Sequence, residues 1–261
     1  MTKLILDLNK SLGQNASLYF DKAKKMKKKL KGAEEALSKS IKELEKLERK
    51  KEKFDIAEKE KEKLRQRKQE WYEKFRWFRS SEGFLIIGGR DATSNEIVIK
   101  KHAEKNDLVF HTDMTGSPFF VIKTEGKKPG EKTIHEAADA TITFSRAFKL
   151  NMTTTPTFMA KPEQLTKEAK SGEFVPKGGF VTTGKLEYID NKINLAVGMT
   201  KENAVMSGPL EAVKKHCEKF VQLQQGNDKV SKAAKYIQYK LGGNLDDIIR
   251  ALPAGSFKIV K

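Results

Sequence analysis

Between residues 33 and 82 the sequence contains no glycine and no proline, and Ala, Leu, Lys, Glu and Arg dominate it. These residue types favour helices and the usual helix breakers are missing, so a long helical segment is expected. Apolar side chains recur at alternating steps of three and four residues from Ala16 to Leu47, with Ser40 as the one polar interruption. A stripe with this spacing is typical of a coiled coil. We therefore expect a coiled-coil arm in the first third of the chain.

Two geometries fit this arm. A second and weaker stripe runs from Phe54 to Phe78, with lysine at two of its positions. One continuous helix from about residue 15 to residue 78 would carry both stripes, with a rise of about 1.5 Å per residue. Alternatively the chain reverses near Lys50–Asp55, and the two stripes pack together as an antiparallel hairpin. The first stripe stops at Leu47 and the second restarts out of phase, which favours the hairpin.

The arm also carries most of the excess positive charge. The formal net charge of the chain is +17, and residues 1–79 hold 25 Lys and Arg against 14 Asp and Glu. Lys and Arg that neutralise phosphates release condensed counterions, so this balance favours nucleic acid as a partner. Six lysines lie within Lys22–Lys29 and repel one another, which argues against a plain spacer or dimer zipper. Within this block we expect Lys24, Lys27 and Lys28 to contact RNA.

Other features exclude several classes of protein. The single cysteine, Cys217, excludes an internal disulfide and a cysteine-based zinc site. Apolar runs are far shorter than the roughly 20 residues that span a bilayer, and the N-terminus lacks a signal-peptide pattern. We therefore expect a cytoplasmic protein with no membrane partner and no cofactor.

From Ser80 onward the sequence changes to short β-rich runs separated by glycine and proline. Such runs predict strands, and longer amphipathic runs predict helices. We expect strands at residues 84–88, 96–100, 107–111, 118–123, 157–160, 179–183, 186–189 and 194–197, and helices at 133–149, 209–220, 228–241 and 245–252. This order indicates an α+β or mixed-sheet α/β domain over residues 80–261, which follows the arm domain at residues 1–79.

The segment Gly88–Glu96 is the first candidate contact with RNA. Its two glycines permit a tight turn and a close approach of a ligand to the backbone. Arg90 offers a planar fork for a phosphate or a base edge, and Asp91 and Asn95 are suited to hold that fork or to read a base. The alternative is a β-turn in which an Arg–Asp pair only closes the loop.

His111 and Asp113 form the second candidate. They are two residues apart at the end of a predicted strand, so they lie on the same face of it. Metal ligation or acid–base chemistry on RNA is one interpretation, but no other histidine has a spacing that completes a metal motif. An internally hydrogen-bonded pair that stiffens the strand end is the other. Without a complete catalytic set, we expect the chain not to be an enzyme.

Further basic residues follow. Arg146 lies on the predicted helix 133–149, and Lys177 and Lys185 lie in and after a second loop rich in glycine and lysine. Lysines and backbone amides near glycine suit RNA phosphates. The segment Trp71–Phe78 holds five aromatics with basic residues between them, which fits base stacking by RNA. We favour the other interpretation, that these aromatics anchor the arm to the globular domain.

Taken together, these motifs resemble the NFACT-R domain and the coiled-coil segment that precedes it in the NFACT family. The resemblance rests on Asn15-Ala16 with Tyr19, Trp71–Phe78, Gly88–Ala92, Asn95-Glu96, Asp107, His111, Asp113, Gly116, Val121–Lys123, Glu136–Ala138, Ser171–Glu173 and Lys177-Gly178. The stretch Ile248–Pro253 is similar to the archaeal form of the family. The N-terminal NFACT-N and helix-hairpin-helix domains have no counterpart in this sequence. We therefore expect a fragment, or a chain that works with a separate NFACT-N protein.

The resemblance implies a role in ribosome quality control during translation. Family members include the NEMF and RqcH proteins, which bind stalled large ribosomal subunits, recruit tRNA and support C-terminal tailing of the nascent chain. The implied partners are tRNA and the ribosomal RNA of the large subunit. By this resemblance the RNA-facing site contains Arg90, Asp91, Asn95, His111, Asp113 and Lys123. The alternative function is an RNA-processing or RNA-modifying enzyme that uses His111 and Asp113.

Overall fold

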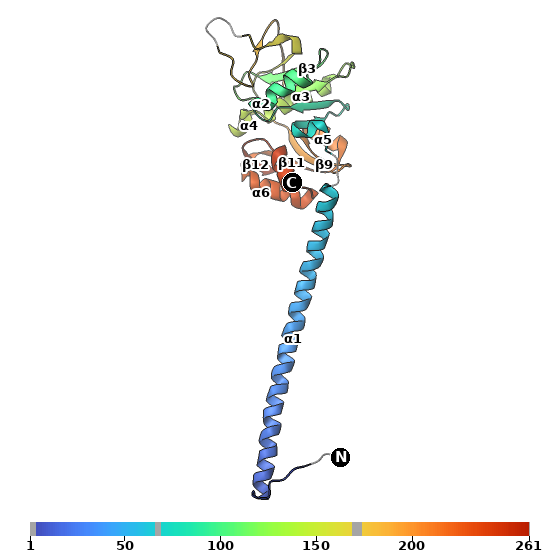
Figure 1. The fold of residues 1–261 in the computed structure, drawn as a ribbon. Helices are drawn as coiled ribbons and strands as arrows, with labels where there is room; N and C mark the ends of the chain where they lie inside the picture. The colour runs from blue at the N-terminus through green and yellow to red at the C-terminus, as the bar shows by residue number, and fades with distance from the viewer. Residues whose placement is uncertain (1–3, 66–68, 169–173, 261) are drawn as a thin grey trace. The chain divides into compact units, whose positions relative to one another are not determined.

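The structure is a computed structural model that describes residues 4–65, 69–168 and 174–260. The chain divides into two compact units, Met1–Glu62 and Lys63–Lys261, and each is described by itself (Figure 1). The boundary between the two functional domains, placed at residue 79 from the sequence, stays a prediction. The α+β class predicted from the sequence is confirmed, because a long helix is followed by antiparallel sheets with helices.

One helix, α1 (Leu12–Arg65), makes up most of the first unit (Figure 1). Its 54 residues correspond to a length of about 80 Å. The helix is continuous through Lys50–Asp55, so the predicted hairpin is wrong. A change of phase in the apolar stripe does not interrupt the backbone hydrogen bonds, and residues of high helix propensity continue across it. The predicted extension to Phe78 is also wrong, because a 3₁₀-helix (Trp71–Lys74) and a strand lie in that region.

The start of α1 is held by local hydrogen bonds. The side chain of Gln14 accepts from the N–H of Ser11 at 2.9 Å, and Ser11 Oγ accepts from the N–H of Gln14 at 3.3 Å, which is the reciprocal pattern of a capping box. Buried Asn15 accepts from the N–H of Asp7 at 2.9 Å. Tyr19 Oη donates to the carbonyl of Ile5 at 2.6 Å. Residues 5–10 are thereby fastened to the first turns of the helix.

The second unit contains a six-stranded antiparallel sheet. The strands stand in the order β1-β2-β4-β3-β5-β8, and each neighbouring pair is antiparallel. Their bounds are β1 Arg76–Arg79, β2 Leu85–Gly88, β4 Phe120–Lys123, β3 Leu108–Thr112, β5 Thr157–Ala160 and β8 Glu187–Ile189. Helix α3 (Glu131–Thr143) packs against β3, β4, β5 and β8, and Figure 1 shows it beside β3. The sequence left α+β and mixed-sheet arrangements open, and the described strand pairs are all antiparallel.

A second antiparallel sheet has four strands in the order β10-β9-β11-β12. Their bounds are β10 Val205–Gly208, β9 Leu195–Thr200, β11 Cys217–Lys229 and β12 Ser256–Ile259. Helices α5 (Leu210–His216) and α6 (Val230–Leu241) pack on this sheet, and α7 (Leu245–Ala251) packs on α6 and β10. The short strands β6 (Leu165–Thr166) and β7 (Val181–Thr182) form a separate pair.

The two larger sheets share one hydrophobic core. Strand β1 contacts β10, and a single cluster of buried side chains includes Phe78 and Phe120 from one sheet and Val197 and Phe257 from the other. Full burial of a large apolar side chain stabilises a fold by about 1.5–3 kcal/mol. Three of the five aromatics in Trp71–Phe78, namely Phe75, Trp77 and Phe78, belong to this cluster. These three rings are therefore buried in the core of the second unit and are not exposed for base stacking, while their predicted role in anchoring the arm stays a prediction.

Several predicted elements change type or extent. The predicted strand 96–100 is helical, since α2 (Ala92–Ile97) runs into a π-helix (Val98–His102). The predicted helix 133–149 is divided, because Ser145 caps a separate helix, α4 (Arg146–Lys149). The predicted helix 209–220 ends at His216, where the long strand β11 begins. No helix in the described ranges is long and apolar enough to cross a membrane.

Candidate nucleic-acid interface

Segments far apart in the sequence line one cleft of about 520 Å³ in the second unit. The lining comes from the β2–α2 loop with the start of α2, from the residues around the β3–β4 loop, from the segment 176–180, and from Arg76 and Phe144. Six residues predicted from the sequence meet here: Arg90, Asp91, Asn95, His111, Asp113 and Lys177. The cleft is therefore the candidate RNA-binding site of this domain.

Asn95 holds two walls of the cleft together. Its buried side chain accepts from the N–H of Phe119 at 3.1 Å and donates to the carbonyl of Ser117 at 3.3 Å. Helix α2 is thereby tied to the loop that enters β4. A side-chain carbon at Gly89 would lie 1.9 Å from Asn95 Oδ1, so only glycine fits there. The amide predicted to read a base is thus engaged inside the protein.

Asp91 is the N-cap of α2. Its carboxylate accepts from the N–H and the hydroxyl of Ser94 at 2.8 and 2.9 Å, and these hydrogen bonds lower the pKa of Asp91. Gly178 has φ +80°, and a side-chain carbon there would lie 2.5 Å from the Cα of Ala92. The segment 176–180, which carries the exposed Lys177, therefore packs closely on the start of α2.

Two partly buried arginines lie at the cleft. Nη2 of Arg90 donates to the carbonyl of Phe75 at 2.8 Å and to that of Glu73 at 3.3 Å. Nη1 of Arg76 donates to the carbonyl of Leu252 at 3.2 Å, and its guanidinium lies 4.5 Å from the Phe144 ring centre. These contacts hold both side chains in place.

The two guanidinium groups repel each other. Burial first and the positive charge of Arg90 second lower the pKa of Arg76 to about 9. Burial is also the main cause that lowers the pKa of Arg90, followed by the charge of Arg250. No ion pair joins either arginine to an acidic side chain in the described residues. The charges of Asp247 and Asp91 partly oppose the shift at Arg90, because they raise its pKa. Within the described residues, the arginine end of the cleft is therefore positive and without an ion pair to either guanidinium.

His111 contributes a neutral ring to the cleft. It stacks on Phe119 with ring centres 4.0 Å apart, and Nε2 lies 3.2 Å from the Ser117 carbonyl. Burial lowers the pKa of His111 to about 4, so the imidazole is uncharged near neutral pH. Because a carbonyl only accepts, Nε2 carries the proton in this contact.

Asp113 is exposed at the cleft, and Tyr188 Oη donates to its carboxylate at 3.4–3.5 Å. Its negative charge raises the pKa of Tyr188. In the described contacts His111 bonds to a backbone carbonyl and Asp113 to Tyr188, so the predicted His–Asp hydrogen bond is replaced by two separate ones. The described ranges contain no cluster of three or more residues able to hold a metal ion.

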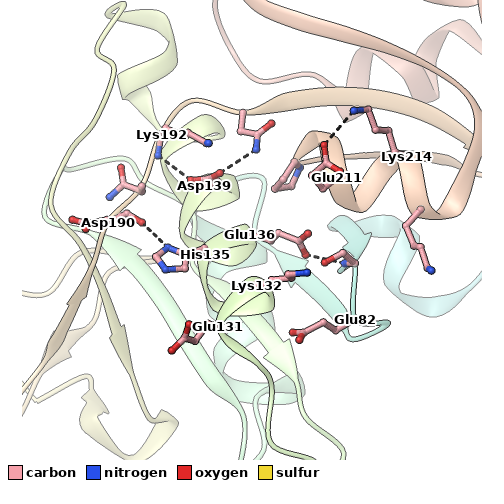
Figure 2. A pocket seen from close by; sticks show the side chains of 15 residues that line it. Glu82, Glu131, Lys132, His135, Glu136, Asp139, Asp190, Lys192, Glu211 and Lys214 are labelled. Carbon is pink, nitrogen blue, oxygen red and sulfur yellow. Dashed lines mark hydrogen bonds and ion pairs between the residues drawn. The ribbon is translucent and has the colours of Figure 1, made fainter.

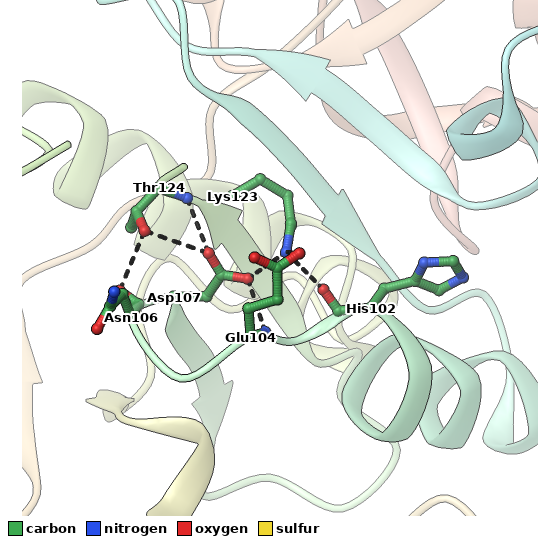
Figure 3. A network of polar contacts seen from close by, with 6 residues as sticks. All are labelled: His102, Glu104, Asn106, Asp107, Lys123 and Thr124. Atoms are coloured by element: carbon green, nitrogen blue, oxygen red, sulfur yellow. Dashed lines mark hydrogen bonds and ion pairs between the residues drawn. The ribbon is translucent and has the colours of Figure 1, made fainter. Parts of the chain in front are cut away.

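Lys123 does not fit the prediction of an RNA contact. Its side chain is buried, and Nζ donates to Asp107, to Glu104 at 2.9 Å and to the carbonyl of His102 at 2.8 Å (Figure 3). Asp107 also accepts from the N–H of Thr124 at 2.8 Å. A buried ammonium needs such partners, and these three contacts use its donors. Lys123 therefore fastens β4 to the segment before β3.

The remaining predicted residues lie outside the cleft lining. Arg146 is exposed at the start of α4, and Lys185 is exposed in the segment before β8. Lys24, Lys27 and Lys28 are exposed on α1, in the first unit. For these five residues, RNA binding stays a prediction.

A larger hollow of about 1260 Å³ lies beside α3 and is lined by side chains of both charges (Figure 2). Glu136 accepts from the N–H of Ser81 at 2.8 Å, and Asp139 accepts from the N–H of Lys192 at 2.9 Å. Burial raises the pKa of both carboxyl groups. These acids fasten α3 to neighbouring segments, and their charge does not favour a polyanion.

Sequence reasoning missed several side chains of the cleft. They are Arg76, Ser117, Phe119, Phe144 and Phe180. One feature of the sequence could have indicated Arg76: it is a basic residue within the aromatic segment Trp71–Phe78. Three aromatics of that segment belong to the hydrophobic core. Phe180 is held by Lys167, whose ammonium lies 4.5 Å from its ring centre and pairs with Glu96 at 2.6 Å. Nothing in the local sequence of these residues indicates that they meet.

Residues 74–184 match the family model of the NFACT protein RNA binding domain, called NFACT-R, and this range contains the whole lining of the cleft. This part of the chain, which contains the cleft, is therefore an RNA-binding domain of the NFACT-R type. The chain is 41% identical over 201 residues to the archaeal Rqc2 homolog aRqcH of Methanocaldococcus jannaschii. The aligned region covers 74% of this chain and 30% of that relative. It is 33% identical over 180 residues to the human ribosome quality control complex subunit NEMF. This alignment covers 67% of this chain and 16% of that protein. The chain belongs to the NFACT family.

The matched region is thus less than a third of the length of these curated relatives. One solved structure, the C-terminal part of the fibronectin/fibrinogen-binding protein from Streptococcus suis, aligns with 44% of each chain at 22% identity and a TM-score of 0.38. That alignment is too partial for the fold or the function to be inferred from it.

Proposed function

We propose that this chain is an RNA-binding component of ribosome-associated quality control that binds stalled large ribosomal subunits and tRNA. The single observation that carries the proposal is that the RNA-binding family match, residues 74–184, contains the whole positively charged cleft. Relatives named as ribosome quality control subunits support the cellular role. In this role the chain supports C-terminal tailing of the nascent chain together with a separate NFACT-N protein.

Charge supports RNA as the partner. The net charge of +17 favours polyanions, and Arg76 and Arg90 add positive charge at the cleft that no described ion pair balances. Lys177 extends that charge to the exposed edge of the cleft. Phosphates of an RNA chain are suited to neutralise these groups.

The chain acts by binding and not by catalysis. The alternative is an RNA-processing enzyme that uses His111 and Asp113. A general base must reach the proton that it removes, but His111 is held by a backbone carbonyl and by stacking on Phe119. Its pKa of about 4 also makes it a weak base near neutral pH. Incubation of tRNA with the protein and divalent metal should therefore leave the tRNA uncleaved and unmodified.

The experiment that tests the proposal measures binding of the protein to tRNA and to purified large subunits at several salt concentrations. Lys177→Glu should weaken tRNA binding about tenfold or more, because it places a negative charge at the edge of the cleft. The matched control is Lys235→Glu on α6, which makes the same charge change at an exposed residue outside the cleft. Equal affinity of the wild type and both variants, independent of salt, would contradict the proposal.

A further inference from the structure

Two buried polar atoms of the cleft lining have no hydrogen-bond partner in the described protein. They are Oγ of Ser117 and Nε of Arg90. The Ser117 side chain is only 3% exposed. A buried donor or acceptor without a partner costs free energy, and most buried polar groups in native proteins are therefore paired. Two such atoms in the residues of one cleft point to a ligand that bonds to them.

The arginine end of the same cleft is positively charged. The charge of Arg90 lowers the pKa of Arg76, and the charge of Arg250 lowers that of Arg90, although Asp247 and Asp91 partly oppose the second shift. Buried charges are ordinarily compensated by an opposite charge. A guanidinium has a planar fork of donors that matches a phosphate. The arginine end of the cleft is therefore suited to one phosphate group.

Aromatic and apolar side chains also line the cleft, beside polar ones that include the carboxylates of Asp91 and Asp113. Phe119 stacks on the His111 ring and makes a T-shaped contact with Phe180, with ring centres 4.0 and 5.4 Å apart. His111 and Phe180 both line the cleft, and neither is fully buried. An uncharged imidazole and a phenyl ring form a surface on which a nucleobase stacks. A phosphate or a metal ion alone would not use this aromatic side.

The size of the cleft limits the ligand to one unit. A volume of about 520 Å³ falls in the range of small-molecule sites, about 300–1,000 Å³, and is far too small for a duplex. In a duplex the base is covered on both faces by its neighbours and its pairing edge is occupied. A base that enters such a cleft must come from a single-stranded loop or end.

We infer that the cleft between the β2–α2 loop, the β3–β4 loop and the segment 176–180 binds a single unstacked nucleotide of RNA. Its phosphate lies on Arg76 and Arg90, its base lies against His111 and Phe180, and Ser117 Oγ hydrogen bonds to it. This inference rests on the proposed function and goes further, because it states which unit of the RNA is bound and by which side chains.

The experiment uses the full chain and measures binding of AMP, CMP, GMP, UMP and inorganic phosphate by calorimetry and ligand-observed NMR. The nucleotides should bind, and inorganic phosphate should bind about tenfold or more weakly, since it lacks the base. A short single-stranded oligonucleotide should displace AMP, whereas a blunt duplex of equal length should not. Nucleotides that bind no better than phosphate, or that the single strand does not displace, would overturn the inference.

Ser117→Ala is the decisive variant, because its hydroxyl has no protein partner to lose. The variant should fold with unchanged or higher Tm and should bind nucleotide about tenfold more weakly. Ser207→Ala is the matched control. It removes a buried hydroxyl that donates to the Ala251 carbonyl at 2.7 Å outside the cleft, so it should lower Tm and leave nucleotide affinity unchanged.

The outcomes separate this inference from the proposed function. If tRNA binds but mononucleotides do not, or if Ser117→Ala binds both as the wild type does, the nucleotide site is disproved while RNA binding stands. If neither tRNA nor nucleotides bind, the proposed function fails as well.

Discussion

Gly89 and Asn95 approach each other so closely that no side chain fits between them. A carbon added to Gly89 would lie 1.9 Å from Oδ1 and 2.8 Å from the backbone N of Asn95. The same Oδ1 accepts from the N–H of Phe119. The loop before α2 and the loop before β4 are therefore joined through Asn95, and both loops line the cleft.

Gly89→Ala should destabilise the domain and weaken tRNA binding together. The added methyl group displaces the Asn95 side chain, and the buried N–H of Phe119 loses its partner. We expect a loss of about 1–3 kcal/mol in the free energy of unfolding, measured by urea denaturation. Gly179→Ala is the control, because its nearest neighbour would be 3.4 Å away, an ordinary contact. Equal stability of the two variants would show that the Gly89 contact is not required.

The sequence predicted which segments meet in the cleft better than it predicted what each residue does there. Glycines and polar residues between predicted strands are visible locally, and the Gly88–Glu96 and His111–Pro118 segments do lie at one cleft. The partners of Arg90 and Asn95 are backbone groups 15 to 24 residues away, so their engagement depends on the tertiary fold. The resemblance placed Lys123 in the RNA-facing site, but its buried position depends in the same way on partners 16 to 21 residues away.

The arm illustrates the opposite limit. Local helix propensity predicted α1 correctly, but the direction of the chain after Leu47 was predicted from the phase of the apolar stripe. That phase determines which face would meet a partner and does not break a helix. Similarly, residues 217–220 were assigned to a helix and residues 221–227 to no element, whereas β11 runs from Cys217 to Lys229 with Val221 and Leu223 alternating inward. The alternation becomes informative only once the neighbouring strands β9 and β12 are known.

Lys123→Met should destabilise the second unit strongly. The substitution leaves the Asp107 carboxylate, which is 1% exposed, without its cation. Loss of one partner of a buried ion pair costs about 3–5 kcal/mol, which urea or thermal denaturation would reveal. The double variant Lys123→Met with Asp107→Asn should recover part of that loss, and Lys105→Met at an exposed residue should change little. A Lys123→Met protein of normal stability that fails to bind tRNA would instead support a direct role of Lys123 in RNA binding.

His111 should make the domain less stable in acid. Its pKa falls from 6.5 to about 4 on folding because burial disfavours the charged ring. The unfolded chain therefore binds more protons between these values, and the free energy of unfolding falls as the pH drops through this window. Above pH 6.5 this contribution is constant.

The pH effect is measured by denaturation of the wild type and of His111→Phe, which keeps a ring for stacking and removes the titration. Between about pH 7 and pH 4 the wild type should lose about 1–3 kcal/mol more than the variant. Comparison with the variant is needed because Asp91, whose pKa is lowered, also loses stability in acid. Parallel stability curves for the two proteins would contradict the assignment.

Neutralising part of the lysine block on α1 should change how RNA binding depends on salt. If Lys24, Lys27 and Lys28 each contact a phosphate, replacing all three with Gln should reduce the slope of log K against log salt by about 2 to 3, since each contact contributes about 0.7–0.9. Gln has nearly the helix propensity of Lys, so circular dichroism should show α1 intact. The matched control replaces Lys39, Lys42 and Lys46, which are exposed on the same helix, and should leave the slope unchanged. An equal decrease in both variants would mean that the positive charge of the whole arm, and not the Lys22–Lys29 block, attracts the RNA.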